Sequence, residues 1–415
     1  MTFLQPGVAW PQLAPFKPIL LLSVLGLLVG WARRATYRRK EVFSNRTFVW
    51  LLVFLFAQFL SLLPHGLSIA LEGLSYWSNY LGFVVISLLL ITDERTLVRY
   101  VWGMMVGSMV IVVVGILAVV YHWSDAVGGR AGAYGMYENH NDYSFIIIQT
   151  LPFLFMYWKT GTGFLRRTLL AAAFVFCVIG ILLSLSRGGM LALVLELILI
   201  VLIGMTGRKR MILLPIMVAI GVAGIGYQWA MRAQNQGNNY TAEDAEDMRF
   251  ELWRAAIKMA IANPVVGVGS GMFSEYADEY SDLSHDVRGK VTHNTYLEVL
   301  TGSGLIGFYA FCAMIFTLIR SLRRTSRAQG PPILDATRKA TLIAMYSIVF
   351  RAVLDAKPRD WSFYVLCSIG IVCAILQRRA EIEAERKAKM DSVAPFPMTA
   401  GQERLLATDR RQRGS

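Results

Sequence analysis

The sequence predicts an all-α, polytopic integral membrane protein with 11–12 transmembrane helices and one large outward loop that contains helices. Two observations lead to this class. Hydrophobic residues make up 55% of the 415 residues, and the mean hydropathy is +0.48. These residues gather in repeated runs of about 20, the length of a helix that crosses a bilayer, and the runs are far longer and more continuous than the strands of a membrane barrel.

Apolar runs that are long enough to span a membrane recur along the whole chain. We place them near residues 16–32, 48–63, 74–92, 97–121, 143–158, 168–185, 188–206, 211–229, 293–319, 340–355 and 361–377. Eleven spans leave the N-terminus outside, so we expect a partial or re-entrant helix within residues 1–16. Twelve spans with both ends inside remain an open alternative.

The net charge of +13 does not indicate a nucleic-acid-binding protein, because the basic residues cluster on alternate connections between spans. The clusters lie at 33–40, 94–99, 159–167, 207–210, 320–327 and in the tail from Gln377. By the positive-inside rule these segments face the cytoplasm. The opposite connections then face outward, namely 64–73, 121–142, 185–188, 230–292 and 356–360.

This pattern divides the chain into four parts. Residues 1–229 form the N-terminal membrane helices, and 230–292 form the outward loop with an amphipathic helix. Residues 293–377 form the C-terminal membrane helices. The tail, 378–415, is charged and lacks apolar periodicity, so we expect a short helix followed by disorder in the cytoplasm.

The middle of the outward loop has helical periodicity. Its apolar side chains recur at helical spacing and charged ones occupy the other side: Phe250, Trp253, Ile257 and Ile261 against Arg249, Glu251, Arg254 and Lys258. This pattern predicts an amphipathic helix that lies at the outer membrane surface. Asn263 and Pro264 end the helix, and the following VVGVGSG predicts a flexible turn.

Arg187 is a cation between two strongly apolar runs, in ILLSLSRGGMLALVLELI. A charged residue at this depth marks a functional site by default, and the alternative is that its side chain only reaches the interface. Gly188 and Gly189 favour the first interpretation, because they allow an anionic group or another backbone to approach closely. The turn also begins a helix, whose free N–H groups favour phosphate.

A second outward segment, GGRAGAYGMYENHNDYSF at 128–145, is polar and glycine-rich immediately before a span. The candidates for binding a sugar or a pyrophosphate are Arg130, Glu138, Asn139, His140, Asn141 and Asp142. The alternative for Asn139 or Asn141 is that its side chain caps the helix that follows.

Three further charges fall within predicted spans. Glu196 lies nine residues after Arg187. Arg351 and Asp355 lie at i and i+4, a spacing that favours an internal ion pair that fixes helix packing.

Several of these segments together resemble one known family. The stretches SLSRGG at 184–189, MRFELWRAAIKMAIANPVVGVGSGMF at 248–273 and THNTYLEVLTGSGLIG at 292–307 are similar to the three signatures of the bacterial O-antigen ligase and polymerase superfamily. Their order matches, as does the position of the second signature in a large outward loop. ENHNDYSF at 138–145 resembles an upstream outward motif of the family. The resemblance covers residues 128–310.

The resemblance implies a multi-pass glycosyltransferase of the GT-C type in the bacterial inner membrane, with its active site facing the periplasm. Its donor would be a glycan on undecaprenyl diphosphate, and its acceptor in a ligase would be a sugar hydroxyl of the lipid A-core. In a polymerase the acceptor would be a glycan on a second carrier lipid, and in a related ligase it would be a protein. The family needs no metal and no cofactor, and it inverts the anomeric centre. The modest size and single dominant loop favour a ligase whose partners are donor, acceptor and membrane lipid, with no nucleic acid.

The resemblance also assigns roles to charged residues. Without a metal, fixed cations must stabilise the diphosphate leaving group, and arginine suits this because it grips phosphate oxygens with two N–H groups. Arg187 and Arg249 occupy matching positions. Arg254 is a candidate to share the role and Arg130 is a weaker one. Whether Arg249 or Arg254 faces the site stays open.

His293 is the candidate general base for the acceptor hydroxyl. Thr292 is the expected N-cap of the next helix, which would place His293 in the first turn, where the helix dipole disfavours the imidazolium. Asn294 and Glu298 are candidates for orienting the ring or the acceptor, although Glu298 is equally placed to pack against another helix.

Two other classes of function also account for a chain with many membrane helices. A transporter is expected to carry polar or broken-helix features near the bilayer midplane, ideally repeated in two halves, whereas here the polar residues gather at one face and no repeat is evident. A membrane scaffold explains the helices, but it does not explain a histidine and arginines grouped on outward segments.

Overall fold

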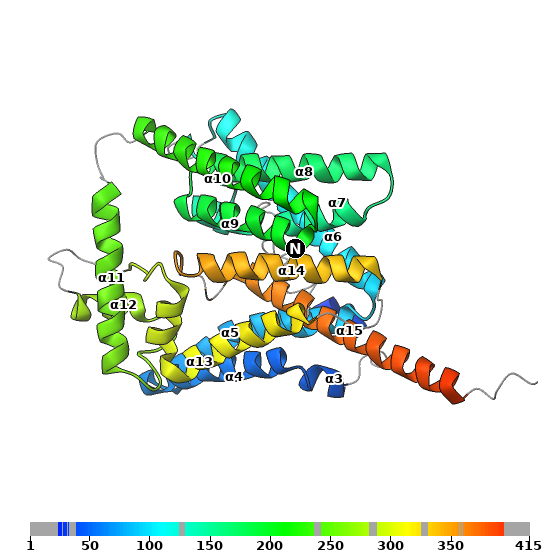
Figure 1. Cartoon of the computed structure of the whole chain (residues 1–415). Helices are drawn as coiled ribbons and strands as arrows, with labels where there is room; N and C mark the ends of the chain where they lie inside the picture. The colour runs from blue at the N-terminus through cyan, green and yellow to red at the C-terminus, as the bar shows by residue number, and fades with distance from the viewer. Residues whose placement is uncertain are drawn as a thin grey trace, which may run out of the picture.

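The computed structural model describes residues 24–26, 28–30, 32, 39–123, 129–235, 242–281, 289–324, 331–356, 358 and 360–393. Within these residues every regular element is a helix and no strand occurs, so the predicted all-α class is confirmed (Figure 1). The α-helices are α3 (Arg39–Phe43), α4 (Arg46–Leu62), α5 (Leu67–Leu90), α6 (Glu94–Val120), α7 (His140–Thr160), α8 (Phe164–Leu183), α9 (Arg187–Gly204), α10 (Arg208–Asn235), α11 (Ala242–Ala262), α12 (Phe273–Tyr280), α13 (Thr295–Arg323), α14 (Pro332–Arg351) and α15 (Trp361–Val393), with short 3-10 turns η2 (Leu63–His65) and η4 (Gly135–Tyr137).

Every expected span from 48–63 onward corresponds to one of these helices. Eight helices in the described part are long and apolar enough to cross a membrane: α4 with η2, α5, α6, α8, α9, α10, α13 and α15. The chain is therefore a multi-pass membrane protein. More than half of the first expected span, 16–32, lies outside the described residues, so the side of the N-terminus and the choice between 11 and 12 spans stay predictions.

Helices α7 and α14 also match expected spans, but they are not apolar enough to count among those eight. Helix α7 begins with His140 and Asn141, and α14 carries Arg338 and Lys339. These two helices pack against each other inside the bundle, and α7 is buried along most of its length (Figure 1). Because protein surrounds them, they do not need a continuous apolar surface toward lipid.

The helices within the 230–292 loop and the last helix mark the two ends of the bundle. In Figure 1, α11 and α12 lie at one end, where α11 runs across the bundle helices, and α15 projects from the other end. Helix α15 continues without a break to Val393, so residues 378–393 extend the last membrane helix. Arg379 on this extension contacts Glu41 at 2.6 Å. The remainder of the expected disordered tail lies outside the described residues.

Helix α11 buries a different stripe from the one expected. Its buried side chains include Leu252, Ala256 and Met259, which pack with residues of α12. Phe250, Ile257 and Ile261 of the expected stripe are 57%, 49% and 73% exposed instead. Helix α11 thus has one apolar side that the protein covers and a second apolar side that is exposed, and it lies across the ends of membrane helices. This arrangement fits the predicted position at the membrane surface.

Glu251 also differs from expectation. It was placed on the polar side of the α11 helix, yet only 6% of the residue is exposed. It is next to the buried Leu252 in the sequence, and its carboxylate forms an ion pair with Arg254 at 3.5 Å. The side of α11 that faces the protein is therefore not purely apolar.

Candidate functional site

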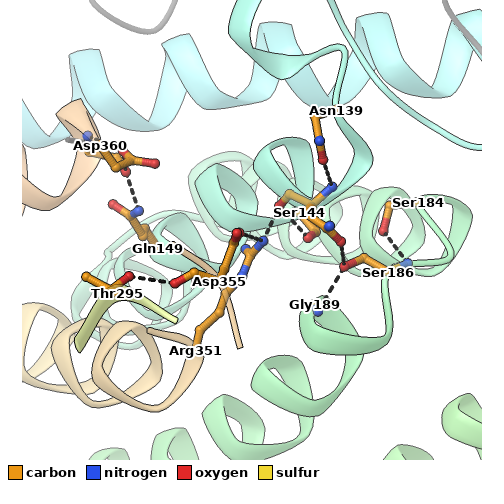
Figure 2. Close-up of polar contacts among 12 residues, drawn as sticks. Asn139, Ser144, Gln149, Ser184, Ser186, Gly189, Thr295, Arg351, Asp355 and Asp360 are labelled. Atoms are coloured by element: carbon orange, nitrogen blue, oxygen red, sulfur yellow. Dashed lines mark hydrogen bonds and ion pairs between the residues drawn. The ribbon is translucent and has the colours of Figure 1, made fainter. Parts of the chain in front are cut away.

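The segments 129–145 and 184–189, both predicted to face outward, form one polar unit (Figure 2). The Ser186 hydroxyl donates to the side-chain oxygen of Asn141 at 2.6 Å. Arg130 donates from Nε to the Ser184 carbonyl at 3.0 Å and from Nη2 to the Leu185 carbonyl at 3.3 Å. The guanidinium thus binds carbonyls at the end of α8, which a helix leaves without partners. Two segments that are about 50 residues apart in sequence are held together by these bonds.

The other candidate binding residues of segment 129–145, Asn139 and His140, make hydrogen bonds within this segment. Asn139 is the N-cap of α7, and its side chain accepts from the Asn141 N–H at 2.8 Å, so the capping alternative is correct for Asn139. His140 Nδ1 lies 3.0 Å from the Ala131 carbonyl. These contacts give Arg130, Asn139 and His140 structural roles, and their binding to a sugar or pyrophosphate stays a prediction.

Arg187 is the first residue of α9 and is half-buried. The preceding Ser186 caps the helix by accepting from the Gly189 N–H at 3.1 Å. A Cβ on Gly189 would lie 2.6 Å from the Ser144 hydroxyl oxygen, so α7 and α9 can approach here only because this residue is glycine. A Cβ on Gly188 would lie 3.8 Å from a side-chain carbon of Leu354. Arg187 therefore begins its helix where α7 and the turn after α14 converge.

Arg351, at the end of α14, connects the segments 129–145 and 184–189 to the turn that holds the start of α13. The predicted ion pair with Asp355 is confirmed, at 3.4 Å, and the Arg351 side chain is only 2% exposed. Its Nη2 also donates to the Asn141 carbonyl, and its guanidinium lies 4.5 Å from the centre of the Phe145 ring. Nη1 has no hydrogen-bond partner among the described residues.

The turn that begins at Arg351 also anchors the start of α13 (Figure 2). The Thr295 N–H donates to the Ala352 carbonyl at 2.7 Å, and the Thr295 hydroxyl donates to the Asp355 carbonyl at 2.6 Å. The sequence predicted only the pairing of Arg351 with Asp355. The link to Asn141 was missed, because it joins residues 210 positions apart and no local pattern records it.

His293 lies just before α13 and not in its first turn. The helix begins at Thr295, and Asn294 is its N-cap, accepting from the N–H groups of Tyr296 at 3.0 Å and Leu297 at 3.1 Å. The prediction that Thr292 is the N-cap of this helix is wrong. The Thr292 hydroxyl instead donates to the Asn294 carbonyl at 2.8 Å. His293 has a φ of +50°, a left-handed conformation that is uncommon outside glycine.

Two side chains fix the backbone next to His293. The Thr292 hydroxyl lies 3.0 Å from the Glu298 carboxylate, and the Trp253 indole N–H donates to the Thr292 carbonyl at 2.9 Å. Glu298 and α11 therefore both act on the residue that precedes His293. Through Thr292, Glu298 helps to hold the backbone beside His293.

The two arginines of α11 differ in their surroundings. Arg249 shares its side of the helix with Leu252 and Met259, which are buried, and it is itself half-buried. The Arg254 side chain is 73% exposed and pairs with Glu251. Of the two, Arg249 thus lies on the side of the helix that faces the protein.

The glycine-rich segment after α11 is packed and not flexible, contrary to the sequence-based expectation. The N–H groups of Val268 and Gly269 donate to the carbonyls of Thr301 and Gly302 at 2.8 and 3.1 Å. Helix α13 is interrupted at Ser303 and Gly304, which frees these carbonyls. Glycine allows the close approach here, so the same residues that suggest flexibility make a tight junction.

Replacing Gly304 by alanine should destabilise the protein by at least ~1–2 kcal/mol, the cost of a left-handed backbone for a residue with a Cβ. Its φ is +59°, and a Cβ would lie 2.3 Å from the Val265 carbonyl oxygen. Gly103→Ala is the matched control, because a Cβ there meets nothing within 4 Å. Thermal unfolding of both purified variants in detergent measures the difference. Equal melting temperatures would contradict the packing argument.

The site combines cations at helix ends with a histidine on a fixed backbone. Arg187 begins α9, and the 351–355 turn binds both Asn141 and Thr295. Among the described residues no three His, Cys, Asp or Glu side chains lie close enough to hold a metal ion. The arrangement offers arginines for an anionic group and an imidazole for a proton.

Residues 172–312 match the protein-family model described as O-Antigen ligase. The match contains SLSRGG, all of α11 and the start of α13, and it supports assigning the chain to the O-antigen ligase family. The resemblance stated from the sequence is confirmed at this level. The segment 128–145 and Arg351 lie outside the matched range. No curated protein matches the chain.

Proposed function

We propose that this chain, assigned through residues 172–312 to the O-antigen ligase family, is a glycosyltransferase that moves O-antigen from undecaprenyl diphosphate to a sugar hydroxyl of the lipid A-core. One observation carries the proposal. Asn141 is bonded to both Ser186 and Arg351, and the turn that begins at Arg351 holds the helix that follows His293. Segments that resemble the family at widely separated positions thus meet through one buried network.

The proposed reaction uses charge and proton transfer only. The acceptor hydroxyl oxygen attacks C1 of the donor sugar, the bond from C1 to the diphosphate oxygen breaks, and the anomeric centre inverts. His293 takes the hydroxyl proton. The negative charge that develops on the leaving diphosphate is stabilised by the guanidinium groups of Arg187 and Arg249, whose paired N–H donors suit phosphate oxygens.

The proposed reaction also predicts where the site lies relative to the membrane. Both substrates are lipids, so the site should lie at a bilayer surface. Phe250, Ile257 and Ile261 give α11 a bare apolar side that suits insertion between lipids beside the site. We assign this surface to the periplasmic face of the inner membrane, because the basic connections belong on the opposite side.

Deleting the gene in its host separates the ligase from its alternatives. Lipopolysaccharide and carrier-linked glycan are compared on gels. Loss of every long-chain ladder, with accumulation of carrier-linked polymer, supports the ligase. A single repeat attached to the core indicates a polymerase. Normal lipopolysaccharide with a protein that has lost its glycan indicates a protein ligase, and unchanged glycans in all fractions contradict the proposal.

In the deletion strain, Arg187→Lys should restore ladder formation poorly, with a transfer rate lower by about 10- to 100-fold. Lysine keeps the charge but loses the pair of N–H donors that grips a diphosphate. Arg208→Lys is the matched control, because Arg208 is an exposed residue at the start of α10. Both variants must reach equal amounts in the membrane. Full activity of Arg187→Lys would indicate that Arg187 only reaches the interface.

A further inference from the structure

A groove lies between α6 and α8 and is separate from the candidate site. It has a volume of about 750 Å³. Its floor includes Met105, Leu154 and Leu170, which are buried, and its rim includes Val106 and Leu169, which are 58% and 61% exposed. Apart from one arginine, every residue that lines it is apolar. The groove therefore suits a hydrocarbon chain.

One end of this groove is polar and basic. A second cavity of about 550 Å³ shares Trp102 and Arg166 with the groove. Its charged lining residues are Glu94, Arg95, Arg99 and Arg166. Three arginines against one glutamate leave an excess of positive charge, so this end favours an anion.

Arg166 stands where the apolar and basic parts meet. Its guanidinium lies 5.5 Å from the centre of the Trp102 ring, which holds the side chain beside the groove. Its buried Nε has no hydrogen-bond partner among the described residues. A buried donor of this kind normally has a partner, so a phosphate oxygen at this position would complete the site.

The basic end lies far from the candidate functional site. Helix α7 begins at His140, within the site, and ends at Thr160, which lines the basic cavity. A helix of 21 residues is about 30 Å long, so the two positions are separated by roughly the hydrocarbon thickness of a bilayer. A lipid whose phosphate binds Arg166 therefore belongs to the other leaflet from the donor of the proposed transfer reaction.

We propose that the groove is a binding site for an anionic phospholipid of the cytoplasmic leaflet, with an acyl chain between α6 and α8 and its phosphate at Arg166, Arg99 and Arg95. The occupant is a lipid because the apolar groove and the basic cavity are neighbours that share Trp102 and Arg166, so one molecule with an acyl chain and a phosphate matches both. Lipid binding here does not depend on glycosyl transfer, and the choice of the cytoplasmic leaflet rests on the orientation given under the proposed function. Binding itself needs only the membrane position of α6 and α8.

Native mass spectrometry of the full-length protein tests the headgroup. The protein is titrated with phosphatidylglycerol or with phosphatidylcholine of the same acyl chains. We expect tighter retention of phosphatidylglycerol, and about tenfold weaker retention in Arg166→Gln and Arg99→Gln, because each loses a charged hydrogen bond. Arg167→Gln is the matched control, since Arg167 lies 5.7 Å from the Trp158 ring but does not line the groove.

Equal retention of the two lipids, or the same loss in Arg167→Gln as in Arg166→Gln, would overturn the proposal. Inorganic phosphate is added as a competitor. If millimolar phosphate displaces phosphatidylglycerol completely, the site recognises the anion alone and the lipid assignment is wrong. Arg99 is exposed, so its variant reports on binding even if Arg166→Gln folds poorly.

A second variant tests the groove without touching any charge. Val106→Trp fills the rim of the groove and should reduce phosphatidylglycerol retention by about tenfold. Val53→Trp is the control, because Val53 is an exposed residue of α4 that lines neither cavity. Unchanged retention in Val106→Trp would show that the acyl chain does not occupy the groove, and the proposal would fall.

Discussion

Replacing His293 by alanine is expected to abolish glycan transfer, with a rate lower by about 10²–10⁴-fold, the usual contribution of a general base. The protein should remain folded and inserted, because the residues on either side of His293 also hold this turn. Thr292 is held by Trp253 and Glu298, and Asn294 caps α13. Complementation of a deletion strain, read as lipopolysaccharide ladders, measures the loss.

A second substitution separates chemistry from backbone strain. The φ of His293 is +50°, a conformation that asparagine adopts more readily than alanine. His293→Asn therefore keeps the turn but removes the base. If the histidine is catalytic, His293→Asn should be as inactive as His293→Ala while melting at the wild-type temperature. Restored ladders in the asparagine variant would indicate a structural role and would contradict the proposed mechanism.

The helices were predictable because they depend on local properties of the chain. Runs of apolar residues fix the position of a membrane helix, and the expected spans from 48–63 onward all correspond to helices. What surrounds each helix was not predictable. Helices α7 and α14 are as long as several of the other membrane helices, yet they lie inside the protein, and only their polar residues hint at this position.

The errors within the outward loop have one physical cause. A glycine-rich stretch is compatible both with a flexible turn and with tight packing, and the partner decides between them. Here the partner is the interrupted part of α13 at Gly304, about 35 residues further along the chain. In the same way Phe250 and Leu252 both suit a buried position. The sequence does not say that α12 covers Leu252 and leaves Phe250 bare.

The sequence was enough to select individual candidate residues of the site, but it did not predict the contacts that connect them. Arg187, Asn141 and His293 are each unusual where they stand in the sequence, and this made them visible. Arg351 was expected only to stabilise helix packing. Its contact with Asn141 gives it a second role, because it joins the turn that holds α13 to the segment that holds Arg187.

Arg351→Met should therefore be the most damaging substitution for stability, costing about 3–5 kcal/mol, the usual effect of removing one partner of a buried ion pair. Methionine preserves much of the volume but leaves the buried Asp355 carboxylate without its cation. Asp142 and Asp360 also interact electrostatically with this guanidinium. We expect little folded protein after detergent extraction and a large fall in melting temperature.

Lys339→Met is the matched control on the same helix. Lys339 pairs with Asp335 at 2.7 Å, but its side chain is 35% exposed, and a pair that water reaches contributes only about 0–1 kcal/mol. If Arg351→Met melts at the same temperature as Lys339→Met, the buried pair is not essential to the fold. A double variant, Arg351→Met with Asp355→Leu, should recover part of the lost stability, because it removes the nearest uncompensated charge. Transfer should not recover with it, since the methionine variant still lacks the bond from Arg351 to Asn141 that joins the outward segments.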